Sequence, residues 1–215
     1  KRTDDGRYRY LLRFIDPPEA AGTSVLILEG DDGELQQYLH LPDLGAPRRV
    51  SGNQRAEAFM GTDFTFEDLR KEKLSDHTYH RMLDAVLGGE RVYKVMSAPV
   101  SVDVLNATGY ERRVLYIDPE TFDIRKIEFF EQGNASVAKI FRGEDFQPTG
   151  RTGIKRPRRV VMENIKRDSR TTLELLRIRL NPPLDDAYFT PKGLQAWSAD
   201  DSAKLMALLN EGALR

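Results

Sequence analysis

Short segments of alternating apolar and polar residues recur along the chain and constrain its fold more than any other feature. In residues 7–14, Tyr8, Tyr10, Leu12 and Phe14 share one face and arginines occupy the other, which predicts a half-buried strand. Similar reasoning predicts strands over residues 25–28, 35–41, 91–96, 100–105, 113–117, 124–130, 136–142, 158–165 and 170–180. Strands at this spacing, with few helices between them, favour an antiparallel sheet over a parallel α/β arrangement.

Two segments carry helical spacing instead. From Asp76 to Leu87, large apolar residues recur at three- and four-residue steps, and Gly88-Gly89 follows as a stop signal. Residues 199–214 suit a C-terminal amphipathic helix. We therefore expect a mainly β (α+β) fold, a curved antiparallel sheet covered by helices, in one domain spanning residues 1–215.

Composition excludes several classes of function. The 33 basic and 34 acidic residues give a net charge of -1, so nothing in the balance calls for nucleic acid. The absence of cysteine excludes disulfides, thiolate metal sites and cysteine nucleophiles. No apolar run is long enough for a transmembrane helix, which leaves a peripheral membrane association at most. We expect no cofactor, and a solvated helix face explains His77 and His80 better than a metal site.

Residues 59–69 pack Phe59, Met60, Phe64 and Phe66 into a segment that Gly61, Thr62 and Asp63 prevent from being one continuous helix. Four large apolar side chains so close together do not remain in water. The segment is therefore predicted to lie against an apolar surface.

The same segment crowds Asp63, Glu67 and Asp68, and paired carboxylates are what general acid–base catalysis needs. A structural role is the favoured interpretation. Asp63 would cap a short turn beginning at Thr65, and the acids would pair with Arg48, Arg49 or Arg55. We expect the protein not to be an enzyme.

Several segments together resemble the outer-membrane lipoprotein-sorting proteins, relatives of the periplasmic lipoprotein carriers. They are Tyr38-Leu39-His40-Leu41-Pro42, residues 59–69, Arg113-Val114-Leu115-Tyr116-Ile117-Asp118 with Glu120-Thr121, Met162-Glu163-Asn164, and Asp185-Asp186-Ala187-Tyr188-Phe189-Thr190-Pro191. The resemblance implies a half-open antiparallel barrel over helices that holds acyl chains in an apolar cavity. It also implies a periplasmic location in a Gram-negative envelope, reached by a signal peptide absent from this chain. The family's N-terminal helix and first strand are expected to be missing.

On this interpretation the apolar residues are candidates for the cavity or its lid, and binding involves no covalent chemistry. The lipid-binding candidates are Tyr8, Tyr10, Leu12, Phe14, Leu26, Leu28, Phe59, Met60, Phe64, Phe66, Met82, Leu83, Ile127 and Phe129. Expected partners are lipid or lipoprotein acyl chains, with an inner-membrane lipid exporter as a further candidate. An alternative is an envelope scaffold with a filled core that docks such a membrane complex through Arg48 and Arg49. A third, less favoured reading is a hydrolase that uses Asp63 or Glu67.

Overall fold

The computed structural model describes residues 6–149 and 154–210 and shows a chain that forms two compact units. The first unit combines Lys1–Ser51 with Arg177–Arg215, and the second is Gly52–Leu176. Each unit is described below by itself. The expectation of a single domain stays a prediction.

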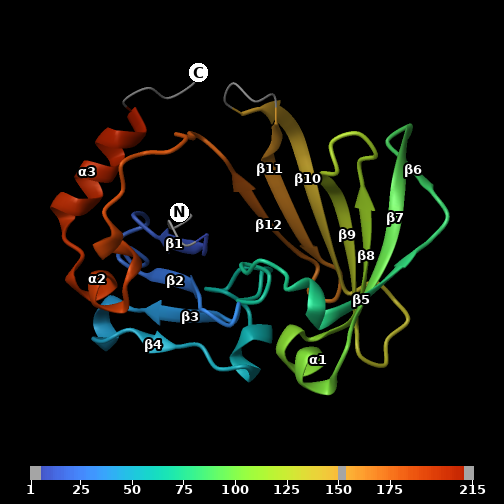
Figure 1. Ribbon diagram of the computed structural model, residues 1–215, viewed down its shortest axis with the longest axis horizontal. Helices are drawn as coiled ribbons and strands as arrows, with labels where there is room; N and C mark the ends of the chain where they lie inside the picture. The colour runs from blue at the N-terminus through green and yellow to red at the C-terminus, as the bar shows by residue number, and fades with distance from the viewer. Residues whose placement is uncertain (1–5, 150–153, 211–215) are drawn as a thin grey trace. The chain divides into compact units, whose positions relative to one another are not determined.

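The first unit contains an open antiparallel sheet of four strands among the described residues, in the order β1-β2-β3-β4 (Figure 1). The strands are β1 (Arg9–Arg13), β2 (Ser24–Glu29), β3 (Leu35–His40) and β4 (Arg48–Arg49). Leu26, in the middle of β2, lies opposite Leu11 of β1 and Tyr38 of β3. Because paired residues share a face of the sheet, these side chains form one apolar surface.

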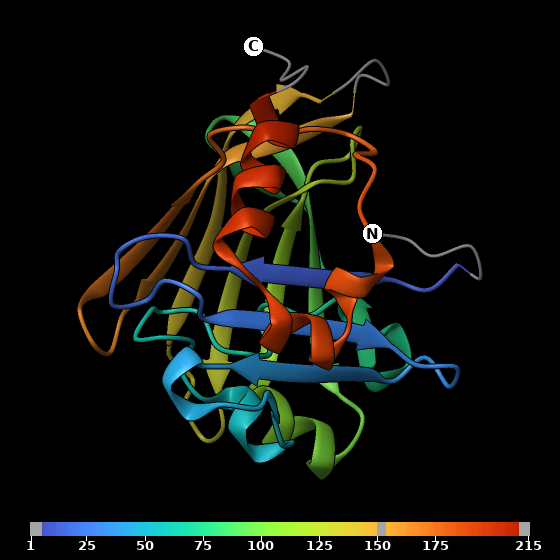
Figure 2. The same ribbon diagram turned by 90° about the vertical axis from the view of Figure 1, so that its left-hand side faces the viewer.

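Helices cover that surface. They are η5 (Asp186–Phe189), α2 (Pro191–Ala196) and α3 (Ala199–Asn210), while η1 (Pro42–Leu44) is a short turn that follows β3. Figure 2 shows α2 and α3 lying across one face of the sheet. Leu26, Phe189 and Leu194 form the buried core between them, and Leu26 and Leu194 are fully buried. The predicted C-terminal helix is confirmed over residues 199–210, while residues 211–214 lie outside the described part of the chain.

In the second unit the described strands form a curved antiparallel sheet in the order β12-β11-β10-β9-β8-β7-β5, and β6 also pairs with β7. The strands are β5 (His77–Arg81), β6 (Ala85–Leu87), β7 (Glu90–Pro99), β8 (Tyr110–Ile117), β9 (Ile124–Glu131), β10 (Lys139–Pro148), β11 (Lys155–Asn164) and β12 (Ser169–Glu174). The helices are η2 (Asn53–Ala56), η3 (Leu74–Asp76) and α1 (Val102–Thr108). Phe64, Tyr110, Phe129 and Met162 form a buried core on one face of the sheet.

The helix predicted from Asp76 to Leu87 is wrong. His77–Arg81 and Ala85–Leu87 are strands that pair with β7. Gly88 and Gly89, with φ angles of 60° and 88°, make the two-residue turn between β6 and β7 rather than ending a helix. Two successive residues with positive φ are the requirement of a tight hairpin turn, which two glycines satisfy without strain.

The strand predicted over residues 100–105 is also wrong, because this region forms α1. The Ser101 hydroxyl accepts a hydrogen bond from the Val104 N–H and so caps the helix. Gly109, with a φ of 75°, ends it in the left-handed conformation. A serine cap and a terminal glycine together define a short helix that the apolar pattern alone does not reveal.

The fold class is confirmed: the protein is mainly antiparallel β with a few helices. The residues described here build two open sheets, whereas the sequence led us to expect one. Of the helices in the described part of the chain, none has the length and apolar character that crossing a bilayer requires.

Candidate functional site

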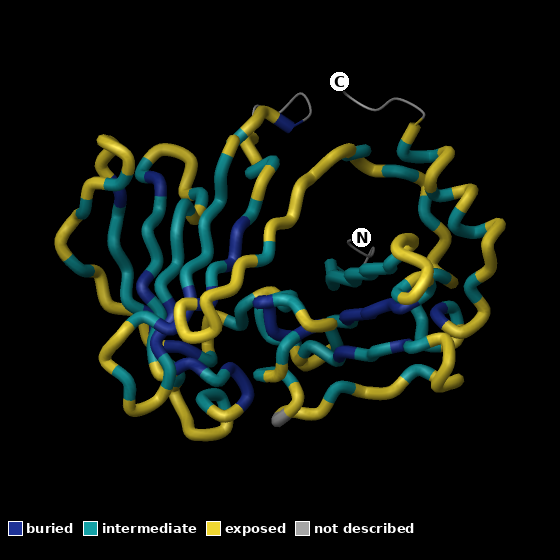
Figure 3. Tube along the Cα trace, turned by 180° about the vertical axis from the view of Figure 1, so that it is seen from behind, coloured by how far each residue is buried: buried dark blue, intermediate teal, exposed yellow. Residues whose placement is uncertain are grey.

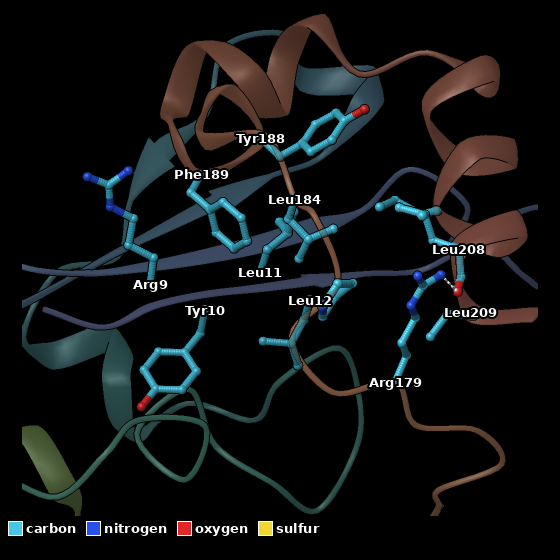
Figure 4. Close-up of a pocket in the computed structure, with 12 residues that line it drawn as sticks. Arg9, Tyr10, Leu11, Leu12, Arg179, Leu184, Tyr188, Phe189, Leu208 and Leu209 are labelled. Carbon is cyan, nitrogen blue, oxygen red and sulfur yellow. Dashed lines mark hydrogen bonds between the residues drawn. The ribbon is translucent and has the colours of Figure 1, made fainter. Parts of the chain in front are cut away.

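An apolar pocket of about 440 Å³ lies in the first unit, beside the edge strand β1 (Figure 4). Its wall combines β1, the segment leading to α2, and one face of α3. Figure 4 shows Tyr10 and Leu12 on one side of β1, and Arg9 and Leu11 on the other. The lining residues are Arg9, Tyr10, Leu11, Leu12, Arg179, Pro182, Leu184, Tyr188, Phe189, Leu205, Leu208 and Leu209.

Local capping places Phe189 and Tyr188 at this pocket. The Asp185 side chain accepts a hydrogen bond from the Ala187 N–H and begins η5. Thr190 then caps α2 by accepting from the Gly193 N–H at 2.9 Å. Position 193 has to be glycine, since a Cβ there would lie 1.9 Å from the Ala187 carbonyl oxygen. This close approach folds α2 back onto η5 and directs Phe189 into the core.

Polar contacts hold the beginning of α3. Ser198 and Asp201 cap it reciprocally, because each side chain accepts a hydrogen bond from the backbone N–H of the other residue. The Tyr188 hydroxyl donates to Asp201 at 3.0 Å, and the Trp197 indole N–H donates to Ser202 at 2.8 Å. These bonds fix the first turn of α3 to the segment that lines the pocket.

The end of α3 is held by arginines. Arg179 donates from Nη1 to the carbonyl oxygen of Leu208, and Arg177 donates to the Asn210 side chain. Cations near the carboxyl end of a helix also interact favourably with its dipole. No described residue of α3 is buried, as the teal and yellow course of the helix in Figure 3 shows. Leu205, Leu208 and Leu209 therefore line the pocket without forming a closed core.

The first unit contains six of the predicted lipid-binding residues. Tyr10 and Leu12 line the pocket, and the Tyr8 and Tyr10 rings stack with centroids 6.1 Å apart. Leu26 is fully buried in the core, and the half-buried Leu28 packs against that core. Phe14 is half-buried just after β1. The structure thus brings two of the six to the pocket wall.

The other eight lie in the second unit, and most of them are core residues. Phe59, Phe64 and Phe66 are buried, as is Phe129, and Ile127 packs against the Phe64 cluster. Met60 is 40% exposed and Met82 is half-buried. Leu83 is 91% exposed in the turn between β5 and β6, so it lines no cavity in this structure, and a lid role for it stays a prediction. Its helical spacing was coincidental.

The segment over residues 59–69 is tied to the sheet of the second unit. The Asp63 carboxylate accepts hydrogen bonds from the Ser169 hydroxyl at 2.6 Å and the Thr171 hydroxyl at 2.9 Å, both from β12. Lys139 Nζ of β10 donates to the Asp63 carbonyl oxygen at 2.9 Å. The predicted cap by Asp63 is therefore wrong. Thr65 and Asp68 cap this turn, each accepting a hydrogen bond from the backbone N–H of the other.

Glu67 pairs with arginines, as the sequence predicted for the acids of this segment. Its Oε2 lies 2.9 Å from Arg70 Nη1 and 3.6 Å from Arg55 Nε. Burial raises the pKa of Glu67 to about 7, against the lowering effects of Arg55 and Arg113. Burial also raises the pKa of Asp68. Glu67 is thus paired with arginines of its own unit, and the hydrolase alternative stays a hypothesis.

Arg48 and Arg49, the predicted partner-binding residues, form β4 at the edge of the four-stranded sheet and are exposed. An exposed strand edge presents unpaired backbone groups, and the charges on it discourage pairing with another chain. In the described residues, no group of three or more histidine, aspartate or glutamate side chains is arranged to hold a metal ion.

The sequence did not identify the pocket residues that follow Leu180. Leu184, Tyr188 and Phe189 belong to irregular or 3-10 segments without an apolar period, and the α3 leucines were predicted only as an amphipathic helix. The signal that could have found them is the unpartnered leucine stripe at positions 205, 208 and 209.

Solved structures share this fold. A candidate outer membrane lipoprotein-sorting protein domain from Vibrio parahaemolyticus is 22% identical, with a TM-score of 0.79 over 88% of this chain and 78% of its own. A DUF1329 family protein from Desulfovibrio piger is also 22% identical, with a TM-score of 0.79 over 90% of this chain and 80% of its own. A LolA superfamily protein from Nitrosomonas europaea is 21% identical, with a TM-score of 0.64 over 85% of this chain and 76% of its own.

These likenesses confirm the predicted resemblance at the level of the fold. No curated protein matches the chain. A family model with the description "Uncharacterized protein" matches residues 6–196, which is well over half of the sequence. The chain therefore belongs to that family, and its fold is that of the lipoprotein-sorting, LolA superfamily and DUF1329 structures.

Proposed function

We propose that this protein is a non-catalytic carrier of the Gram-negative cell envelope that holds a lipid or lipoprotein acyl chain in the pocket of its first unit. The observation that carries the proposal is the apolar pocket of about 440 Å³ between β1 and α3. Its volume falls within the range of small-molecule sites, roughly 300–1,000 Å³. The names of two fold neighbours, which refer to lipoprotein sorting and to LolA, support a carrier in the periplasm.

The construction of α3 supports reversible binding. An acyl chain gains free energy by leaving water, at about 25 cal/mol per Å² of buried apolar surface. Leu205, Leu208 and Leu209 provide such surface, while the helix itself contributes no buried residue to the core. Movement of α3 away from β1 would break the hydrogen bonds at its two ends but would expose no buried residue of α3, and no covalent step is needed.

The test is native mass spectrometry with organic extraction of protein purified from a Gram-negative periplasm. We expect a co-purified lipid or acylated peptide, and uptake of a fluorescent fatty acid by delipidated protein. Leu208→Asp should reduce uptake strongly, since it places a charge in the pocket wall. The matched control is Ala207→Asp, which puts the same charge on the adjacent, exposed position of α3. Equal uptake by both variants would refute the pocket assignment.

The scaffold alternative rests on the exposed arginines of β4, Arg48 and Arg49, which would dock an inner-membrane lipid exporter. This alternative requires no bound lipid. A lipid-free protein that takes up no fatty acid, yet loses binding to envelope membranes when both arginines are replaced by glutamine, would favour it over the carrier.

A further inference from the structure

A second hollow of about 570 Å³ adjoins the apolar pocket in the first unit. Arg9 and Phe189 line both, so the two hollows meet at these side chains. The apolar pocket is lined mainly by leucine and aromatic side chains. The second hollow is lined mainly by polar ones from β1, the β2–β3 turn and the start of α2. A ligand occupying both would have an apolar chain and a polar end.

The charges of the second hollow are mixed. Arg7 and Arg9 supply two guanidinium groups, and Glu29, Asp31 and Asp32 supply three carboxylates. Arg7 pairs with Asp31 at 2.5 Å, and the Asp31 side chain is 95% exposed. Arg9 makes a longer contact of 3.5 Å with Asp186. A guanidinium carries five N–H donors, so an anionic oxygen bound at Arg9 would share them with the partners that Arg9 already has.

Two of the carboxylates are fixed by backbone contacts. Glu29 Oε2 accepts from the Tyr8 N–H at 2.8 Å, and Asp32 Oδ1 accepts from the Glu34 N–H at 2.9 Å. Each contact engages one oxygen, and a carboxylate has two, each with two acceptor sites. These acids are therefore held in place with acceptor capacity for an ammonium donor.

We infer that the second hollow binds the head group of a zwitterionic phospholipid that carries a primary ammonium, as in phosphoethanolamine. The inference rests on the proposed function, because the acyl chain of the same lipid would fill the apolar pocket. The phosphate would lie at Arg9, where the hollows meet, and the ammonium at Glu29 and Asp32. A purely anionic head group would face three carboxylates. A choline head group has no N–H to donate to them, and such groups are bound by aromatic faces instead.

The inference is tested with the delipidated full chain and vesicles that contain equal amounts of dioleoyl phosphatidylethanolamine, phosphatidylglycerol and phosphatidylcholine. Native mass spectrometry of the re-isolated protein measures each bound lipid. We expect the ethanolamine lipid to exceed each of the others on the order of tenfold, the effect of one or two charge-assisted hydrogen bonds.

The discriminating variant is Glu29→Gln with Asp32→Asn, which removes both charges while an amide oxygen can still accept from Tyr8 and Glu34. Its preference for the ethanolamine lipid should be lost, while total bound lipid stays unchanged. The control, Glu19→Gln with Asp43→Asn, removes two exposed charges of the same unit and should keep the preference.

Lipid binding without head-group preference, an unchanged preference in the Glu29/Asp32 variant, or an acylated peptide as the bound species would each overturn the head-group assignment and leave the carrier function intact. A folded protein that binds none of the lipids would overturn both.

Discussion

Lys139 Nζ donates a 2.9 Å hydrogen bond to the backbone carbonyl oxygen of Asp63, which joins β10 to a segment that lies 76 residues earlier in the chain. Lys139 is only 8% exposed, and burial lowers the pKa of its ammonium group. A buried carbonyl that loses its donor pays the cost of desolvation without compensation. This bond is therefore expected to stabilise the second unit.

Replacing Lys139 by methionine keeps the apolar stem and removes the donor. We expect Lys139→Met to lower the free energy of unfolding by about 1–3 kcal/mol. Urea unfolding followed by circular dichroism measures the change. The control is Lys192→Met at an exposed position of α2, which should shift the midpoint little. Equal midpoints for the two variants would show that the bond does not stabilise the fold.

Phe64 is expected to act on folding rather than on lipid retention. It is 5% exposed and packs with Tyr110, Phe129 and Met162. Phe64→Ala should destabilise the protein by about 3–5 kcal/mol, through lost burial and a residual cavity. Met60→Ala, at a 40% exposed position of the same segment, should cost little. A stable Phe64→Ala variant with impaired lipid uptake would instead restore the lid role that the sequence suggested.

Glu67 should make stability fall as the pH rises. Burial raises its folded-state pKa from an ordinary value near 4.5 to about 7, so the folded state holds a proton that the unfolded state has lost. This contribution is fully present below about pH 4.5 and disappears as the pH passes about 7. Between pH 5 and pH 8 it amounts to roughly 2–3 kcal/mol.

The measurement is the free energy of unfolding of the wild type and of Glu67→Gln at both pH values. The wild type should lose stability relative to the variant at the higher pH. The control variant Glu57→Gln, at an exposed position nearby, should show the same change in stability with pH as the wild type. If the wild type were instead more stable relative to Glu67→Gln at pH 8 than at pH 5, the ion pairs with Arg55 and Arg70 would stabilise the charged carboxylate by more than burial destabilises it.

Asp118 should have the opposite pH dependence. Its Oδ2 lies 2.6 Å from Arg125 Nη2, and its Oδ1 accepts from the N–H groups of Glu120 and Thr121. Arg125 and these N–H groups hold the pKa of Asp118 below its usual range. The resulting stability is present above about pH 3.8 and is lost as the pH falls.

Asp118→Asn should therefore cost roughly 1–3 kcal/mol at pH 7 and progressively less as the pH falls below about 3.8. Thermal unfolding at several pH values gives the comparison. If the loss of stability did not become smaller in acid, the Asp118 side chain would stabilise the turn of residues 118–121 through its geometry and not through its charge.

The alternation of apolar and polar residues predicted most of the strands, because a half-buried antiparallel strand has one apolar and one polar face. It could not say which face helices would cover. In β1 the arginine face is the one beneath the helices: Arg13 lies 4.7 Å from the Trp197 ring centroid and Arg9 pairs with Asp186. Aromatic and acidic partners about 180 residues away decide this, and no local period reports them.

The same limit explains the two misassigned segments. Tyr79, Met82 and Val86 satisfy a helical period by coincidence, while pairing of β5 and β6 with β7 determines their conformation. For the candidate site, the sequence predicted Tyr10 and Leu12 but not Leu184 or Phe189, whose positions follow from capping by Asp185 and Thr190. Capping acts through single side chains and leaves no repeated pattern.

The first unit draws on both Lys1–Ser51 and Arg177–Arg215, with all of Gly52–Leu176 between them. On a ribosome that adds about 5–20 residues per second, β1 would emerge on the order of ten seconds before α3 is made. During that interval β1 lacks α3 as the other side of the pocket, while the strands of the second unit are being completed. A chaperone that shields the nascent β1–β3 sheet would therefore act in the interval before the pocket wall is closed.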